Sequence, residues 1–240
     1  MEWSDDGIVL SARKHGESAA IAVLLTREHG RYAGLVHGGS SRRMHGMLEP
    51  GNRVRVTWRA RLDEHLGSFS SPFDLVSNVS ASLLDDPLRL TALQAICAVA
   101  EAALPEREKH KDVFLGLLGL LDALSGESWA AGYVRWELAL LADLGFGLDL
   151  SACAATGSND NLTYVSPKSG RAVSASAGEP YRDRLLSLPG FLLREQHVPG
   201  VGEVAAGLAL TGYFLDRHVL EPHGKTLPLA RGRLVDRLGR

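Results

Sequence analysis

Cysteine is scarce in this 240-residue chain, which contains only Cys97 and Cys153. Two thiols cannot form the disulfide framework of a small secreted protein, and they fall short of the ligand set of a structural zinc site. Such low cysteine usage is typical of proteins of the reducing cytoplasm, and we expect this location for the chain. We expect no bound metal.

Long apolar runs are also missing. No stretch approaches the ~18 consecutive apolar residues of a transmembrane helix, so we expect no membrane association. The first residues, MEWSDDG, are acidic and lack the apolar core of a signal peptide. With 45% hydrophobic and 22% charged residues, the chain has the composition of a globular protein with a buried core.

The motifs of the common catalytic classes are absent as well. The sequence contains no H-E-x-x-H, no G-x-S-x-G, no P-loop and no G-x-G-x-x-G after a strand. The histidines of the N-terminal part have spacings that match no metal signature. We therefore expect a binding protein with no catalytic residue and no cofactor.

Charge is distributed unevenly along the chain, although the net charge is only −2. Residues 1–80 hold 10 Lys/Arg and 9 Asp/Glu, residues 81–160 hold 5 and 12, and residues 161–240 hold 11 and 7. The ten basic residues of the first block all lie from Arg13 to Arg61, where only three acidic residues accompany them. Basic and acidic regions in succession predict separate modules with separate partners.

Strand patterns fill the first 78 residues. Short apolar or alternating runs occur at 7–14, 19–26, 31–38, 52–62 and 67–76. Turn signals such as Glu28-His29-Gly30 separate them. Five short strands in this order predict a small barrel of the OB type.

The run at 52–62 alternates between apolar and basic residues. Val54, Val56 and Trp58 fall on one face, and the other face carries Arg53, Arg55, Arg59 and Arg61. Side chains on one face of a strand stand about 6.7 Å apart, so these arginines would form a row that can follow a phosphate backbone. The alternative is an ordinary solvated barrel face.

The segment GGSSRRMHGMLEPG (38–51) favours the phosphate interpretation. Its glycines would bring backbone N–H groups close to a ligand, its serines add hydroxyl donors, and Arg42-Arg43 add charge. We interpret it as a flexible phosphate-binding loop. The predicted nucleic-acid contacts are Arg42, Arg43, Arg53, Arg55, Arg59 and Arg61, with Arg13, Lys14, Arg27 and Arg31 as helpers.

From residue 79 onwards the apolar period becomes helical. Asp86-Pro87 predicts a capped helix start, and further helices are predicted at about 113–124, 129–144, 201–220 and 229–240. The last two helices and the break between them carry basic residues interleaved with leucines, namely Arg217, His218, Lys225, Arg231 and Arg233. This C-terminal basic region could receive an acidic, partly apolar peptide or phosphates; the alternative is a charged outer helix face.

Four segments, in the same order along the chain, resemble the RecO family of bacterial DNA repair proteins. They are VHGGSSRRMHGMLEPGNRVRVTW (36–58), RWELALLADLGFGLDLSACAATG (135–157), YVSPKSGRAVS (164–174) and HGKTLPLARGRLVD (223–236). Ala230 departs from the family pattern, which has Ser or Thr at this position.

The resemblance implies a multidomain α+β fold. An N-terminal five-stranded OB-type barrel (1–78) would be followed by a mainly α-helical domain (79–150), completed by the C-terminal helices (179–240). A zinc-knuckle-like β segment would be inserted between them (151–178). In the family's zinc-binding form this segment has two C-x-x-C pairs, whereas here only Cys153 is present. We therefore expect a metal-free knuckle that keeps its turns at Gly157 and at 166–170.

The resemblance also implies activity without turnover. Such proteins bind single- and double-stranded DNA, anneal complementary strands and help load recombinase onto strands covered by single-strand-binding protein. The implied partners are RecR and the acidic C-terminal tail of single-strand-binding protein, in the cytoplasm at the nucleoid. An OB-containing RNA-binding module and a non-catalytic assembly adaptor are the alternatives.

Overall fold

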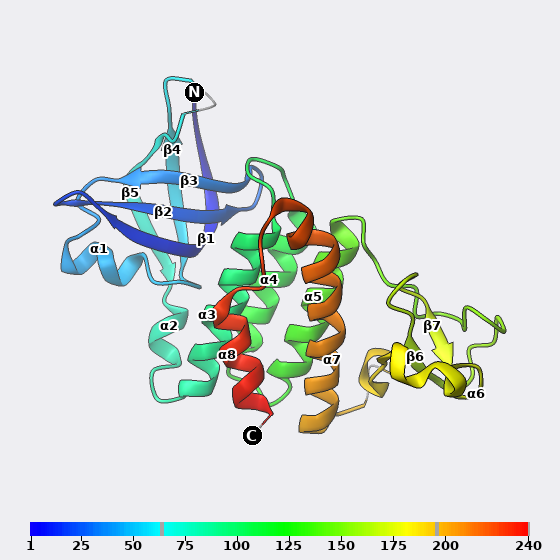
Figure 1. Ribbon diagram of the computed structural model, residues 1–240. Coiled ribbons are helices and arrows are strands. Elements are labelled where there is room, and N and C mark those ends of the chain that lie inside the picture. The colour runs from blue at the N-terminus through cyan, green and yellow to red at the C-terminus, as the bar shows by residue number, and fades with distance from the viewer. Residues whose placement is uncertain (63–64, 195–196, 240) are drawn as a thin grey trace. The chain divides into compact units, whose positions relative to one another are not determined.

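The computed structural model describes residues 1–62, 65–194 and 197–239 (Figure 1). The chain divides into two compact units, each formed by two segments. The first consists of Met1–Ser125 with Pro228–Leu234, and the second of Gly126–Leu227 with Val235–Arg240. The predicted domain limits at residues 78, 150 and 178 stay predictions.

Five strands form a closed barrel in the first unit (Figure 1). They are β1 (Glu2–His15), β2 (Ala19–Thr26), β3 (Gly30–Val36), β4 (Arg53–Arg59) and β5 (Ser68–Ser77). Their order around the barrel is β1-β2-β3-β5-β4, with β3 and β5 parallel and the other neighbours antiparallel. The predicted OB-type barrel followed by a helical region is confirmed.

The barrel interior explains the alternation along β4. Val54, Val56 and Trp58 are at most 1% exposed and pack with residues such as Leu24 and Phe69. The intervening arginines are exposed or half-buried on the outside. β1 begins at Glu2, earlier than the predicted residue 7, because its first residues pair with β4 rather than with β2.

The helices of the first unit are α1 (Arg42–Met47), α2 (Val79–Ser82), α3 (Pro87–Ala103) and α4 (Lys111–Ala123), and α8 (Leu229–Leu238) begins in this unit. α3 packs against β1 and β2. The Asp86 carboxylate accepts hydrogen bonds from the N–H groups of Leu88 and Arg89, as the predicted N-cap requires.

A loop between α3 and α4 fastens the helices to the barrel. Arg31 Nε donates to the carbonyl of Leu104 at 2.8 Å, and the N–H of Arg107 donates to the carbonyl of Arg31 at 2.9 Å. Gly30 has φ +78°, and a Cβ there would lie 1.8 Å from the carbonyl oxygen of Glu108. Only glycine permits this approach.

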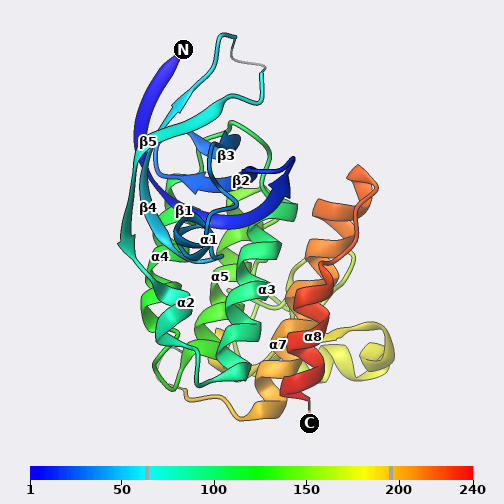
Figure 2. The same ribbon diagram turned by 90° about the vertical axis from the view of Figure 1, so that its left-hand side faces the viewer.

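α1 lies inside the segment that the sequence analysis interpreted as a flexible loop, on the side of the barrel that Figure 2 shows. A six-residue helix is too short to be stable alone, so tertiary contacts must hold it. The fully buried amide of Asn52 supplies them: its Nδ2 donates to the carbonyls of Gly46 and Met47, and its Oδ1 accepts from the N–H of Val79.

The second unit contains α5 (Trp129–Asp143), which packs against α7 (Val201–Phe214), and a π-helix that continues α7 over Leu215–Leu220. It also contains a three-stranded sheet of order β7-β6-β8, formed by β7 (Ala172–Ser174), β6 (Leu162–Val165) and β8 (Leu186–Ser187), with the short helix α6 (Ala175–Gly178). Within the described residues, no helix has the length and apolar character that crossing a bilayer requires.

Candidate nucleic-acid interface

The outer arginines of β4 face carboxylates of β1. The strands are in register so that Arg59 lies opposite Glu2 and Arg55 opposite Asp6. Arg59 Nη2 lies 2.8 Å from Glu2 Oε1, and Arg55 Nε lies 2.9 Å from Asp6 Oδ1. The hydrogen bonds from Arg59 hold the pKa of Glu2 below its ordinary value, so this pair persists in mildly acidic solution.

The row on β4 is therefore a ladder of ion pairs rather than a bare stripe of positive charge. Arg53, at its end, pairs with Asp122 of α4 at 3.3 Å. A phosphate that binds this ladder must compete with the carboxylates. The sequence analysis missed these partners because they lie about fifty residues or more away along the chain.

Two of the predicted helpers have other roles. Arg31 binds the α3–α4 loop, pairs with Glu106 at 3.3 Å, and its side chain is only 11% exposed. Arg27 is exposed and lies 3.7 Å from Glu28. We leave Arg31 out of the proposed interface, because its guanidinium already fastens the barrel to the helices.

Half of the predicted contacts carry no such partner. Their side chains are exposed and make no ion pair among the residues that the structure describes; they are Arg13, Lys14, Arg42, Arg43 and Arg61. Unpaired cations are the groups that a polyanion neutralises at the lowest cost.

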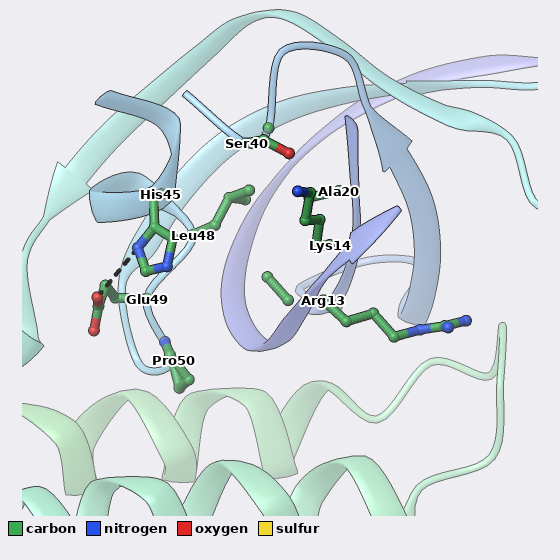
Figure 3. A pocket seen from close by; sticks show the side chains of 10 residues that line it. Arg13, Lys14, Ala20, Ser40, His45, Leu48, Glu49 and Pro50 are labelled. Carbon is green, nitrogen blue, oxygen red and sulfur yellow. Dashed lines mark ion pairs between the residues drawn. The ribbon is translucent and has the colours of Figure 1, made fainter. Parts of the chain in front are cut away.

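Four of these unpaired cations belong to a pocket of about 480 Å³ or to the helix beside it. Arg13 and Lys14, at the end of β1, line the pocket, and α1 contributes His45 to it and carries Arg42 and Arg43 in its first turn. Figure 3 shows Lys14 beside Ala20 and below Ser40, while the Arg13 side chain extends outward. We call Arg13, Lys14, Arg42 and Arg43 the basic cluster.

The loop before α1 was expected to offer free backbone N–H groups to a ligand, but the N–H groups of Gly39 and Ser40 are already hydrogen-bonded within the protein. The N–H of Gly39 donates to the carbonyl of Val36 at 3.1 Å, and that of Ser40 donates to Ser18 at 3.2 Å. The Ser40 hydroxyl also donates to a backbone carbonyl, that of Ala19. The prediction that this loop grips phosphate through its N–H groups is wrong for Gly39 and Ser40, because the first bonds the end of β3 and the second bonds the β1–β2 turn.

Aromatic side chains of the barrel form an inner cluster. Trp58 is fully buried and stacks on Trp3 with a centroid distance of 5.6 Å, and Tyr32 packs edge-on against both rings. The guanidinium of Arg107 lies 5.4 Å from the centre of the Tyr32 ring. The described barrel therefore has exposed arginines on its surface, while Trp58 and Tyr32 are buried and Trp3 is half-buried against them.

The predicted partner-binding residues fall in both units. Arg217 is exposed and pairs with Glu221 at 3.3 Å. His218, on the π-helix, stacks on Phe146 and Phe214 at centroid distances of 5.7 and 5.6 Å. π-Helical turns are frequent at functional sites.

The other three residues of that prediction differ in exposure. Lys225 is exposed and belongs to the second unit, whereas Arg233 is exposed and belongs to the first. Arg231 is only 4% exposed. A partner cannot reach a buried guanidinium, so Arg231 is left out of the proposed docking surface.

The knuckle-like segment holds its cysteine with hydroxyl groups. Cys153 is 1% exposed; its Sγ accepts from the N–H of Ser174 at 3.3 Å and donates to the Ser174 hydroxyl at 3.5 Å. Hydrogen bonds from Ser174 and Thr156 lower the pKa of Cys153 to about 6. Over the described residues, no group of three His, Cys, Asp or Glu side chains could hold a metal ion.

A closed five-stranded barrel with a basic cluster, joined to a helical unit, places the chain in the class of OB-barrel proteins with an appended helical domain. Two family models match it: Recombination protein O N terminal over residues 1–73 and Recombination protein O C terminal over residues 84–227. The chain therefore belongs to the RecO family.

Curated relatives extend this similarity over the whole chain. A DNA repair protein RecO from Rhodospirillum centenum is 60% identical over 239 residues, which cover 99% of this chain and 94% of the relative. One from Rhodospirillum rubrum is 53% identical over 247 residues, covering 100% and 97%.

Proposed function

We propose that this protein is a non-enzymatic mediator of DNA repair and recombination. It binds single- and double-stranded DNA, anneals complementary strands and helps load recombinase onto strands covered by single-strand-binding protein, in the cytoplasm at the nucleoid. Membership of the RecO family supports this function. The observation that carries it is the basic cluster, which has two unpaired cations in one pocket of the barrel and two more on the helix that contributes His45 to that pocket.

Neutralised charge is the physical basis of the proposed annealing. Two DNA strands repel each other, so a surface that neutralises both raises their rate of encounter. Contacts from Arg and Lys to phosphate carry no sequence information, so binding is tolerant of sequence and weakens as salt rises.

The basic cluster is the primary contact in this proposal. Arg61, the fifth unpaired cation, is a separate contact beyond the end of β4. The ladder on β4 is a second, weaker contact, because a phosphate must displace a carboxylate from each guanidinium there. Its residues are Arg53, Arg55 and Arg59, and Arg27, which lies near Glu28, ranks with them.

A matched pair of variants tests this ranking. Changing Arg13, Lys14, Arg42 and Arg43 together to Gln should weaken binding to a single-stranded oligonucleotide at least about tenfold at ~100 mM salt, measured by fluorescence anisotropy. The control, Arg55→Gln with Arg59→Gln, should change it less than about threefold, because those charges are already paired. Wild-type affinity in the fourfold variant contradicts the proposal.

For the second unit we propose that it docks the acidic, partly apolar tail of single-strand-binding protein. The exposed cation Arg217 lies one residue from the ring stack of His218, Phe146 and Phe214, in which Phe146 is 40% exposed. A positive charge beside an apolar surface suits a peptide that is both acidic and apolar. Lys225 is a further candidate in this unit, and RecR is a proposed partner through the family alone.

Titration of an acidic, apolar peptide against Arg217→Glu tests this docking. Charge reversal should weaken binding about tenfold, because it replaces attraction by repulsion. The control is Arg182→Glu, an exposed arginine elsewhere in the second unit, which should bind like the wild type. Equal affinities for all three proteins would remove Arg217 from the interface.

The alternative functions predict different results in the same assays. An RNA-binding module would bind single-stranded RNA as tightly as DNA or more tightly. An assembly adaptor would bind neither nucleic acid but would still form a stable complex with a protein partner.

A further inference from the structure

The pocket beside the basic cluster has two chemically different sides. Arg13 and Lys14 lie on one side, and Glu49 lies on the other with His45, whose Nδ1 is 3.7 Å from Glu49 Oε1 (Figure 3). Between them the lining is largely apolar and is formed by Ala12, Ala20, Leu48 and Pro50.

A phosphate fits only the first of these sides. Arg13 and Lys14 attract it, whereas the carboxylate of Glu49 repels it and the apolar lining cannot replace its hydration. A nucleobase suits the rest of the pocket, because its faces are apolar and its edge carries N–H donors that a carboxylate accepts.

Both walls of the pocket are held in place before any ligand arrives. Ser40 is hydrogen-bonded to the β1–β2 turn, and a Cβ on Gly39 would lie 2.6 Å from the Cβ of Ala20, so the loop packs directly on β2. On the other wall, Asn52 binds the carbonyls at the end of α1. A preformed pocket costs little to order on binding.

The size of the pocket restricts its occupant. A volume of about 480 Å³ falls in the range of small-ligand pockets, roughly 300–1,000 Å³. A base must leave the duplex stack and its pairing partner before it can enter, which an unpaired strand does at much lower cost.

We propose that this pocket accepts one unstacked base of single-stranded DNA while Arg13 and Lys14 hold the adjoining phosphates. The proposal rests on the function proposed above and adds a base-binding element to it. The protein then senses that a strand is unpaired and does not only sense its charge.

Comparison of normal and abasic strands tests this inference. An abasic oligonucleotide keeps the phosphates and lacks the bases, so the wild type should bind oligo(dT) about five- to tenfold more tightly than an abasic strand of equal length. Ala12→Phe fills the pocket from an exposed position of β1 and should remove this preference by weakening oligo(dT) binding alone.

The matched control is His15→Phe, which adds an aromatic ring at the end of the same strand outside the pocket and should keep the wild-type preference. Equal binding of the two strands by the wild type, or an unchanged preference in Ala12→Phe, overturns the inference. The fourfold Gln variant of the basic cluster distinguishes the proposed phosphate contacts from the proposed base binding. If this variant binds the abasic strand as tightly as the wild type does, the phosphate contacts themselves are refuted.

Discussion

The two cysteines show how the surroundings of a side chain set its chemistry. Cys97 of α3 is 1% exposed, and burial raises its pKa to about 12. The thiolate of Cys153 accepts hydrogen bonds from Ser174 and Thr156 in the knuckle, and its pKa falls to about 6. This difference could not be predicted from the sequence, because Ser174, whose hydrogen bond lowers the pKa of Cys153 most, lies 21 residues away along the chain.

Thiol modification at different pH values distinguishes the two. Above pH 6 Cys153 is a thiolate, so its rate of alkylation by a small reagent, measured where the rate is proportional to reagent concentration, should be nearly constant from pH 7 to 9. Cys97 stays protonated and should react only on unfolding. Cys153→Ser should remove the faster phase. A rate that rises about tenfold per pH unit would show an ordinary thiol at Cys153.

The same depressed pKa makes the knuckle sensitive to acid. The thiolate of Cys153 is favoured in the folded protein relative to the unfolded chain, in which a thiol titrates near 8.5. Its contribution to stability is therefore complete above that pH and is lost as the pH falls through about 6.

Arginines illustrate what local sequence can predict. The alternation of Arg53, Arg55 and Arg59 correctly placed their side chains on the outside of the barrel. Their carboxylate partners were not predictable from spacing. Glu2, for example, is more than fifty residues from Arg59 along the chain, and only the register between β1 and β4 brings the two together. The cations left unpaired could be identified only from the structure.

At the scale of secondary-structure elements, a regular repeat of apolar residues gave the most accurate predictions. Long helices and alternating strands were predicted close to their observed limits, such as α3 at Pro87–Ala103. α1 was missed because six residues that include Gly46 have little helical tendency, and the amide of Asn52 that holds it comes from the connection to β4. Short elements depend on contacts that no local pattern contains.

The knuckle-like segment forms its predicted turns although it has no set of metal-ligating side chains among the described residues. Gly157 has φ +74°, and the N–H of Gly170 donates to the carbonyl of Ser166 at 2.9 Å, closing the predicted turn. Hydroxyl groups of Thr156 and Ser174 contact the Cys153 thiol where further thiolates would bind zinc.

Elemental analysis tests this account of the segment. The purified protein should contain no stoichiometric zinc, whereas about one zinc per chain would contradict it. A variant with Thr156→Cys, Ser174→Cys and Ala177→Cys restores two C-x-x-C pairs and should bind about one zinc, because the turns already bring residues 156 and 174 to Cys153. The single variant Ala177→Cys is the matched control and should bind none.

At the scale of the molecule, the proposed DNA contacts lie in the first unit and the proposed peptide-docking surface lies in the second. The basic residues of the first block lie on the barrel strands, their connections and α1, and the structure separates the paired ladder from the unpaired cluster. The second unit carries the ring stack of His218, Phe146 and Phe214, all of which follow the barrel strands in the sequence. The uneven distribution of charge along the chain was enough to predict separate modules. It could not predict which cations are unpaired, because ion pairing depends on the tertiary fold.

The central claim is that the basic cluster binds the phosphates of DNA. The most direct test is the salt dependence of single-stranded DNA binding, since each phosphate contact contributes about 0.7 to the slope of log K against log salt. The fourfold Gln variant of the cluster should lower the magnitude of that slope by up to about 3 relative to the wild type, and Arg55→Gln with Arg59→Gln by less than about 1. An unchanged slope in the fourfold variant would contradict the account.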